Sequence, residues 1–309
     1  MIYTCTITPS LDYTTYLPDF QLGKLNRSGE VYYYPGGKGI NVSRVLRRLD
    51  TDTVAISFAG GFTGDYIEQY LHKEGIQTDF IPTKEITRIN VKIKSAQETE
   101  LNGPGPASTQ KEKHQLMEKV QKMKRGDCFV LAGRIPASIP IRFLKELAES
   151  CHVIGVDFVL DTSGPALKEL VQMKPFLIKP NEQELGELFD TEIKTKQEAY
   201  HYAKKLVDQG VHHVIVSMGG EGALLVTKEL ALLAEAPKGV VVNTVGAGDS
   251  LVAGFIAAYY VDKDAEKAFR YGVASGSATA FQSDLCRKVD VEALLNQVKI
   301  TTLDEKDVK

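Results

Sequence analysis

The chain has 309 residues, of which 43% are hydrophobic and 25% charged, and its formal net charge is -3. This composition allows a sizeable core in one large α/β domain or in two ordinary domains. It gives no reason to expect a nucleic-acid partner, because nucleic-acid-binding domains usually carry a basic excess. No apolar run reaches the roughly 18 residues of a membrane span, so no membrane partner is expected.

The cysteines and the first residues indicate the compartment. The N-terminal stretch from Met1 to Asp12 lacks the basic region and apolar core of a signal peptide. The four cysteines lie far apart, without metal-ligand spacing, and we expect them to be buried thiols in a reducing compartment: Cys5, Cys128, Cys151 and Cys286. A cytoplasmic location is therefore expected.

Strands and helices are expected to alternate along the chain, which predicts a mainly parallel sheet covered by helices on both faces. The expected strands are 2–8, 53–58, 128–131, 153–157, 176–178 and 213–217. The expected helices are 40–49, 65–73, 139–149, 182–188, 197–208, 249–260 and 265–280. The tail after Thr302 is expected to fray.

Two stretches, 13–34 and 86–101, interrupt this alternation with short β-type pieces. In the second, the apolar residues Ile89, Val91 and Ile93 alternate with polar ones, as on a half-buried strand. We expect the two stretches to form a small separate sheet over the carboxyl edge of the main sheet, where ligand sites of α/β proteins form.

An early glycine-rich segment, Pro35-Gly-Gly37-Lys38-Gly-Ile-Asn41, runs into an expected helix. It is not a Walker A loop, because glycine follows the lysine where serine or threonine is needed. Glycines that let the backbone come close to a ligand, together with one lysine and one amide, suit a phosphorylated, polyhydroxylated ligand. A flexible turn with a solvated lysine explains the same residues. Asp12, just past the first strand, is either a ligand group or a helix cap.

Two segments in the middle of the chain each follow an apolar strand. In Lys179-Pro-Asn181-Glu-Gln-Glu184, Asn181 and Glu184 share a helical face. They could position a hydrated Mg²⁺, or they could simply cap the helix. The segment Ser217-Met-Gly219-Gly220-Glu221-Gly222 could wrap a nucleotide or could only form a hairpin turn.

The strongest local signal is Asn243-Thr-Val-Gly246-Ala247-Gly248-Asp249-Ser, which precedes an apolar helix. The glycines leave backbone N–H groups uncovered at a helix N-terminus, where partial positive charge gathers. Such groups suit a transferring phosphoryl group, and Asp249 is placed to take a proton from an attacking hydroxyl. A turn with Asp249 as a helix N-cap is the alternative.

Together and in this order, the segments resemble the ribokinase-like (PfkB) carbohydrate kinase family over essentially the whole chain. The resemblance implies a single domain over 1–309 with a three-layer α/β/α fold, whose small sheet, from about 13–34 and 86–101, forms a lid. Within the family, the similarity is greatest to bacterial 1-phosphofructokinases and next to tagatose-6-phosphate kinases. It is carried by the segments Thr8–Asp12, Leu25–Arg27, Thr87–Lys92 and Glu100–Pro106.

The resemblance implies transfer of the ATP γ-phosphoryl group to O6 of fructose 1-phosphate, which gives fructose 1,6-bisphosphate. Asp249 would be the base, and the N–H groups of Gly246, Ala247 and Gly248 would stabilise the transferring group. Asn181 and Glu184 would hold Mg²⁺ through water. The implied nucleotide contacts are Lys179, Gly248, Ser217, Gly219, Gly220, Glu221 and Gly222.

On the sugar side, the resemblance implies contacts from Asp12, Gly37 and Asn41 and a phosphate site built from cations. The expected cations are Lys38, Arg88 and Arg27. Arg134, where the family usually has a small residue, would either add a phosphate contact or fold outward. The lids of relatives pair, so a homodimer through the lid is expected.

The alternatives to this function are a tagatose-6-phosphate kinase and a sugar-phosphate sensor without catalysis. A dinucleotide-dependent oxidoreductase is disfavoured, because the Gly-rich fingerprint is missing after the first strand.

Overall fold

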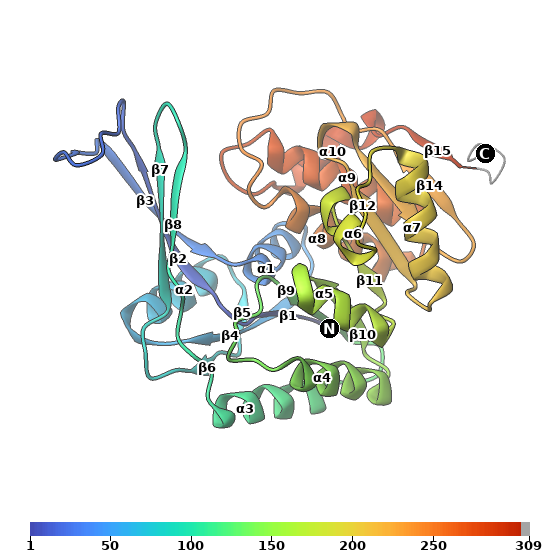
Figure 1. The fold of residues 1–309 in the computed structure, drawn as a ribbon, viewed down its shortest axis with the longest axis horizontal. Coiled ribbons are helices and arrows are strands. Elements are labelled where there is room, and N and C mark those ends of the chain that lie inside the picture. The colour runs from blue at the N-terminus through green and yellow to red at the C-terminus, as the bar shows by residue number, and fades with distance from the viewer. Residues whose placement is uncertain (304–309) are drawn as a thin grey trace.

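The structure, a computed structural model, describes residues 1–303. Figure 1 shows a large central sheet between helices and a second, smaller sheet that projects from one end of the molecule. The main sheet has eleven strands. In spatial order they are β15 (Ile300–Thr302), β14 (Ala231–Ala234), β13 (Ala223–Val226), β12 (His213–Ser217), β11 (Leu177–Ile178), β10 (Asp157–Asp161), β9 (Cys128–Ala132), β1 (Ile2–Thr6), β4 (Thr53–Ala59) and β5 (Gln77–Thr78), with β6 (Ile81–Pro82) also paired to β4.

The main sheet is parallel from β12 to the β4 edge, and only β13, β14 and β15 are antiparallel. Its middle strands are buried on both faces, as parallel sheets require. Along β9, for example, Cys128 and Val130 belong to one hydrophobic cluster, whereas Phe129 and Leu131 belong to the other. The expected mainly parallel sheet is therefore confirmed.

Helices cover both faces of this sheet. One layer, packed on the cluster that contains Phe129, consists of α3 (Gln110–Gln121), α4 (Ile141–Ile154), α5 (Gly164–Leu170), α6 (Glu182–Leu188) and α7 (Lys196–Asp208). The other consists of α1 (Lys38–Arg48), α8 (Ala247–Asp262), α9 (Ala265–Ala280) and α10 (Lys288–Leu294). α2 (Gly61–Lys73) packs near the β4 edge against Ile40 and Ala55. The expected three-layer α/β/α architecture is confirmed.

The small sheet has the strand order β3 (Glu30–Gly36), β2 (Ser10–Tyr16), β7 (Arg88–Lys94) and β8 (Thr99–Asn102), which confirms the expected separate sheet. Its strand β2 starts shortly after β1 ends, and β3 leads directly into α1. Because parallel strands carry their ligand sites at the carboxyl edge, this connection places one end of the small sheet beside that edge.

One expected strand, 153–157, is wrong. Helix α4 continues to Ile154 and ends at Gly155, whose φ of 85° reverses the chain, so the strand begins only at Asp157. Val153 lies in the last helical turn and is 88% exposed. A short run of Val and Ile does not separate strand from helix by itself.

Several elements were not anticipated. Helix α3 begins with a capping box, in which Thr109 accepts from Glu112 N and the Glu112 side chain accepts from Thr109 N. The hairpin of β13 and β14 and the edge strand β15 were also missed.

The four cysteines are buried and free, as expected. Within residues 1–303, no helix has the length and apolar character to cross a membrane. The expectation of a frayed tail concerns 304–309, which lie outside the described residues.

Candidate active site

The two glycine-rich segments meet at the carboxyl edge of the main sheet. The Asn41 side chain, in the first turn of α1, donates from Nδ2 to Asp249 Oδ2 at 2.8 Å, which joins residues 208 positions apart in the sequence. Gly37 is the N-cap of α1 and has a φ of 122°. A Cβ there would lie 2.5 Å from Thr6 Cγ2, so only glycine fits between α1 and the end of β1.

Asp249 lies in the first turn of α8, and only 6% of it is exposed. It does not cap the helix, because the N-cap is Gly246, so that alternative is wrong. Burial raises the pKa of Asp249 to about 6, and the neighbouring Asp161 carboxylate adds to this, against the opposing effects of Lys38 and Asn41. A carboxylate with this pKa is ionised at neutral pH and is basic enough to accept a proton.

The backbone before Asp249 has the features of an anion hole, and the N–H groups of Gly246 and Gly248 are called the anion hole below. The N–H groups of Gly246 and Gly248 donate to no acceptor within residues 1–303, whereas Ala247 N donates to Thr244 O at 3.2 Å. The free N–H groups lie at the N-terminus of a 16-residue helix, whose dipole favours negative charge there. Gly246 and Gly248 therefore match the expected role, but the N–H group of Ala247 is already used inside the turn.

Gly246 provides a first test of the anion hole. Its φ is 81°, where alanine is strained, and a Cβ would lie 2.5 Å from Leu285 Cδ2, so in Gly246→Ala the turn or the Leu285 side chain must move. We expect kcat to fall about tenfold, because the N–H donors move away from the transferring group. The matched control is Gly126→Ala. Gly126 has a similar φ of 86° but no neighbour within 4 Å, so only stability should fall, by about 1 kcal/mol. Equal kcat in the two variants, measured in parallel with melting temperatures, would contradict the assignment.

Asp161, at the end of β10, is a site residue that the sequence analysis missed. It is 1% exposed, and its Oδ1 lies 3.0 Å from Lys38 Nζ and 3.8 Å from Lys179 Nζ. Burial alone would raise the pKa of Asp161, but Lys179 and Lys38 outweigh burial and hold it below its usual value. Its Oδ2 is buried and has no partner among the described residues. The sequence signal for this residue was an acidic residue at the end of an apolar strand, which in a parallel sheet lies at the carboxyl edge.

The two lysines face the anion hole. A Cβ on Gly248 would lie 3.0 Å from Lys179 Nζ, so this ammonium group lies directly against the glycine backbone. Burial disfavours the charged form of Lys38, yet the Asp161 and Asp249 carboxylates outweigh burial and raise its pKa. Lys38 is therefore held in its charged form, and both lysines lie beside the turn that carries the free N–H groups.

Asp12 lies within strand β2 and not at a helix end, so the capping alternative is wrong for this residue. Its carboxylate accepts from Ser10 Oγ at 2.6 Å and from Asn90 Nδ2 at 3.0 Å, and it forms an ion pair with Lys92 at 3.0 Å. Asn90 Oδ1 is buried without a partner among residues 1–303. Asn90 and Lys92 were missed as site residues, although Arg88, Asn90 and Lys92 alternate on one face of β7.

Arg88, one of the expected cations, lies near Arg134, which is exposed. Arg88 donates only to main-chain oxygens, Pro9 O at 3.4 Å and Gly103 O at 3.2 Å. Burial lowers the pKa of Arg88; Asp12 opposes this, and the nearby Arg134 guanidinium lowers it further. Among residues 1–303 neither arginine forms an ion pair, so the pair has positive charge to offer an anion. Arg27 is exposed in the loop between β2 and β3. Figure 1 shows that this loop lies at the far end of the small sheet, so Arg27 is not brought to this group.

The segments of the expected nucleotide side lie together. Asn181 forms a β-bridge with Ser217, and Ser217–Gly222 turns from β12 into the antiparallel β13. The hairpin turn is therefore present. Gly219 and Gly220 lie at its tip and are open to solvent, with no atom within 4 Å of where a Cβ would be. Lys196 forms an ion pair with Glu221 at 3.4 Å.

Asn181 and Glu184 form a reciprocal capping box at the start of α6. Asn181 Oδ1 accepts from Glu184 N at 2.7 Å, and Glu184 Oε2 accepts from Asn181 N at 2.9 Å. The described residues contain no cluster of three or more His, Cys, Asp or Glu side chains that could cage a metal. One carboxylate oxygen of Glu184 remains free of hydrogen bonds within residues 1–303. This set fits a Mg²⁺ ion that keeps most of its water and binds mainly to phosphates.

These features can be compared with known proteins. Residues 8–291 match the pfkB family of carbohydrate kinases. The chain belongs to this family. A 1-phosphofructokinase of Bacillus subtilis is 51% identical over 303 residues, which cover 98% of this chain and 100% of the relative. A D-tagatose-1-phosphate kinase of Bacillus licheniformis is 36% identical, over 98% of this chain and 100% of the relative.

The pfkB fold is equally clear in a solved structure. The Escherichia coli phosphofructokinase-2, crystallised with fructose 6-phosphate, superimposes with a TM-score of 0.91 at 30% identity, over 96% of this chain and 98% of that one. As a carbohydrate kinase of the pfkB family, the chain has ATP as its expected phosphoryl donor. The place where Asn41 meets Asp249 is therefore the candidate active site of a carbohydrate kinase.

Proposed function

We propose that this chain transfers the γ-phosphoryl group of ATP to O6 of fructose 1-phosphate and forms fructose 1,6-bisphosphate. The observation that carries the proposal is the buried Asp249, held by Asn41 directly behind the uncovered N–H groups of Gly246 and Gly248. The choice of sugar phosphate is supported by the name of the 51% identical Bacillus subtilis relative.

In the proposed reaction, Asp249 takes the proton of the O6 hydroxyl as O6 bonds to the γ-phosphorus. The bond between that phosphorus and the bridging oxygen breaks, and ADP leaves with the electron pair. The N–H groups of Gly246 and Gly248, together with the Lys179 ammonium, take up charge on the transferring group. Mg²⁺ bound with the nucleotide would neutralise phosphate charge, and Glu184, positioned by Asn181, is the carboxylate that would hold its hydration shell.

Arg88 and Arg134 are proposed to bind the C1 phosphate, which carries close to two negative charges near neutral pH. They lie close together without carboxylate partners among the described residues, which suits a dianion. Lys38, which pairs with Asp161 and acts electrostatically on Asp249, is proposed to contact the sugar phosphate as well. Asp12 and the unpartnered carbonyl of Asn90 are proposed to bind sugar hydroxyls.

The small sheet is proposed to act as a lid over the sugar and to pair with the lid of a second subunit. Tyr16, Tyr32 and Tyr33 are 46%, 41% and 47% exposed, and large aromatic side chains on such a surface are typical of an interface. A closed lid would exclude water, which would otherwise accept the phosphoryl group. A cytoplasmic enzyme is proposed because its substrates are cytoplasmic metabolites.

The test compares kcat/KM with MgATP for four ketohexose phosphates: fructose 1-phosphate, tagatose 1-phosphate, tagatose 6-phosphate and fructose 6-phosphate. We expect fructose 1-phosphate to be preferred at least tenfold, equivalent to about 1.4 kcal/mol of transition-state binding. The tagatose 1-phosphate competitor differs only at C4, and the 36% identical relative makes it the second candidate. A higher value for either tagatose phosphate would keep the family and overturn the proposed substrate. No turnover of any of the four would favour a sensor.

A further inference from the structure

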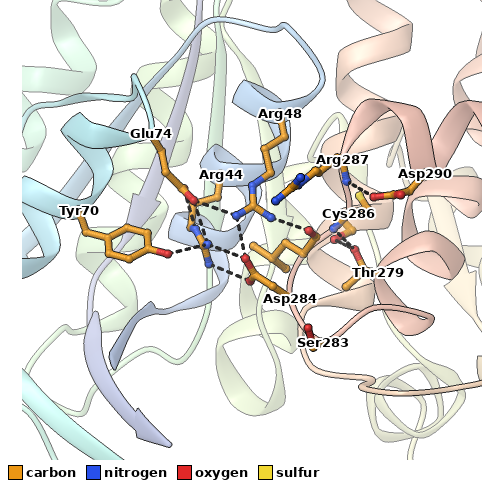
Figure 2. A network of polar contacts seen from close by, with 12 residues as sticks. Arg44, Arg48, Tyr70, Glu74, Thr279, Ser283, Asp284, Cys286, Arg287 and Asp290 are labelled. Carbon is orange, nitrogen blue, oxygen red and sulfur yellow. Dashed lines mark hydrogen bonds and ion pairs between the residues drawn. The ribbon is translucent and has the colours of Figure 1, made fainter. Parts of the chain in front are cut away.

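A cluster of four charged side chains lies along α1, beyond Asn41. In this charged cluster, Arg44 and Arg48 of α1 lie between Glu74, at the end of α2, and Asp284, in the loop after α9 (Figure 2). Arg44 donates to Glu74 at 2.8 and 3.0 Å and to Asp284 at 3.1 Å. Arg48 donates to each of the two carboxylates at 2.8 Å and also to Leu285 O.

The loop that carries Asp284 supports the anion hole. The Leu285 side chain fills the space beside Gly246, and Asn243 donates to Ser283 O at 3.4 Å. Behind them, Thr279 Oγ1 donates to Ser250 Oγ at 2.7 Å and accepts from Cys286 N at 3.0 Å. The turn of Gly246–Asp249 therefore rests on loop 281–287, whose Ser283, Asp284 and Cys286 are labelled in Figure 2.

The charged cluster ties this loop to α1, whose Asn41 side chain bonds Asp249. Asn41, which bonds Asp249, and Arg44, which bonds Asp284, are three residues apart and lie on the same side of α1. Arg44 is 2% exposed and Arg48 is 18% exposed, so neither guanidinium can move far without losing its partners. One rigid helix thus contacts the turn of Gly246–Asp249 twice, directly through Asn41 and indirectly through Arg44 and loop 281–287.

We propose that Asp284 is a positioning residue that, through loop 281–287, holds the turn of Gly246–Asp249 in register with Asn41 of α1. The inference deepens the proposed phosphoryl transfer and rests on it. A displacement of the N–H donors of about 1 Å from the transferring oxygens can cost about 10²-fold in rate. The N–H donors act mainly on charge that develops in the transition state, so their displacement lowers kcat and leaves the sugar KM almost unchanged.

Variants of the two carboxylates in the cluster distinguish an effect on the position of the turn from an effect on stability. Asp284→Asn weakens the tie to the loop, while Arg44 and Arg48 keep Glu74. Glu74→Gln weakens the pairing of α1 with α2, while both arginines keep Asp284. The matched outside control is Asp52→Asn: Asp52 is 82% exposed and pairs at 3.3 Å with Arg47 of the same helix, outside the cluster.

The experiment measures kcat, both KM values and Tm of the full chain with MgATP and fructose 1-phosphate at 25 °C. We expect Asp284→Asn to lower kcat about tenfold with the sugar KM within about twofold. Glu74→Gln should lower Tm at least as much as Asp284→Asn but keep kcat within about twofold, and Asp52→Asn should change neither quantity.

Wild-type kcat in Asp284→Asn would overturn the inference, and so would an equal loss of kcat in Glu74→Gln. Failure of the underlying function is a separate result, because the unmodified chain would then show no turnover. If Asp284→Asn does not fold, Arg48→Met replaces it, since Arg48 is the other half of the same tie; wild-type kcat in that variant would overturn the inference equally.

Discussion

Replacement of the base should abolish most of the activity: Asp249→Asn is expected to lower kcat about 10³-fold while both KM values change little. Asparagine keeps the size and the hydrogen bond to Asn41 but cannot accept the O6 proton, and general base catalysis typically contributes about 10²- to 10⁴-fold. The N–H groups of Gly246 and Gly248 remain in place, so a residual rate should persist. The measurement is steady-state ADP release with fructose 1-phosphate.

The stability of this variant provides an internal control. The folded pKa of Asp249, about 6, lies above its ordinary value of 3.8, so its ionised form is disfavoured by folding. Its contribution to stability is thus most favourable at low pH and is lost as pH rises towards the folded pKa. At pH 8 the Asp249→Asn variant should therefore melt no lower than the unmodified chain. Asp262→Asn, at the exposed far end of the same helix, should retain full kcat. A retained rate in Asp249→Asn would exclude Asp249 as the base.

Much of the fold could be predicted from the sequence, because the period of the apolar residues differs between helices and strands. The bounds of β12, α6 and α9 agree with the expected ranges at both ends. The prediction failed where apolar residues formed a short unbroken run, as before Gly155, because such a run fits the end of a helix as well as a strand. The positive φ of Gly155, which decides between them, is fixed by the fold and not by the run itself.

The site was predicted only as far as local motifs reach. Gly246, Gly248 and Asp249 belong to one turn and could be assigned together. Asp161 could not be assigned, because its role depends on a lysine 123 positions earlier in the sequence. The pair Asn181 and Glu184 shows a different limit: a capping box and a hydrated metal site use the same spacing, and only the structure shows which hydrogen bonds are made.

Asp161→Asn is expected to lower kcat/KM about 10²-fold and to move its acid limb to lower pH. The carboxylate holds the ammonium groups of Lys38 and Lys179 beside the anion hole, and a neutral amide would leave both without their shared partner. Asp161 also raises the pKa of Asp249, because two negative charges in a buried site disfavour each other. Without it, Asp249 ionises more readily and stays active as a base at lower pH.

The measurement is kcat/KM for fructose 1-phosphate between pH 5 and 8, in the unmodified chain and in two variants of β10. The phosphate group of the substrate titrates near pH 6 as well, but it does so equally in every variant, so any shift between profiles belongs to the protein. Asp157→Asn, at the opposite end of the same strand, removes the carboxylate charge that faces Tyr260 and should leave the acid limb unchanged. If Asp161→Asn loses rate but keeps the acid limb, Asp161 positions the lysines without controlling the base. If its acid limb moves to higher pH, Asp249 is not the group that titrates.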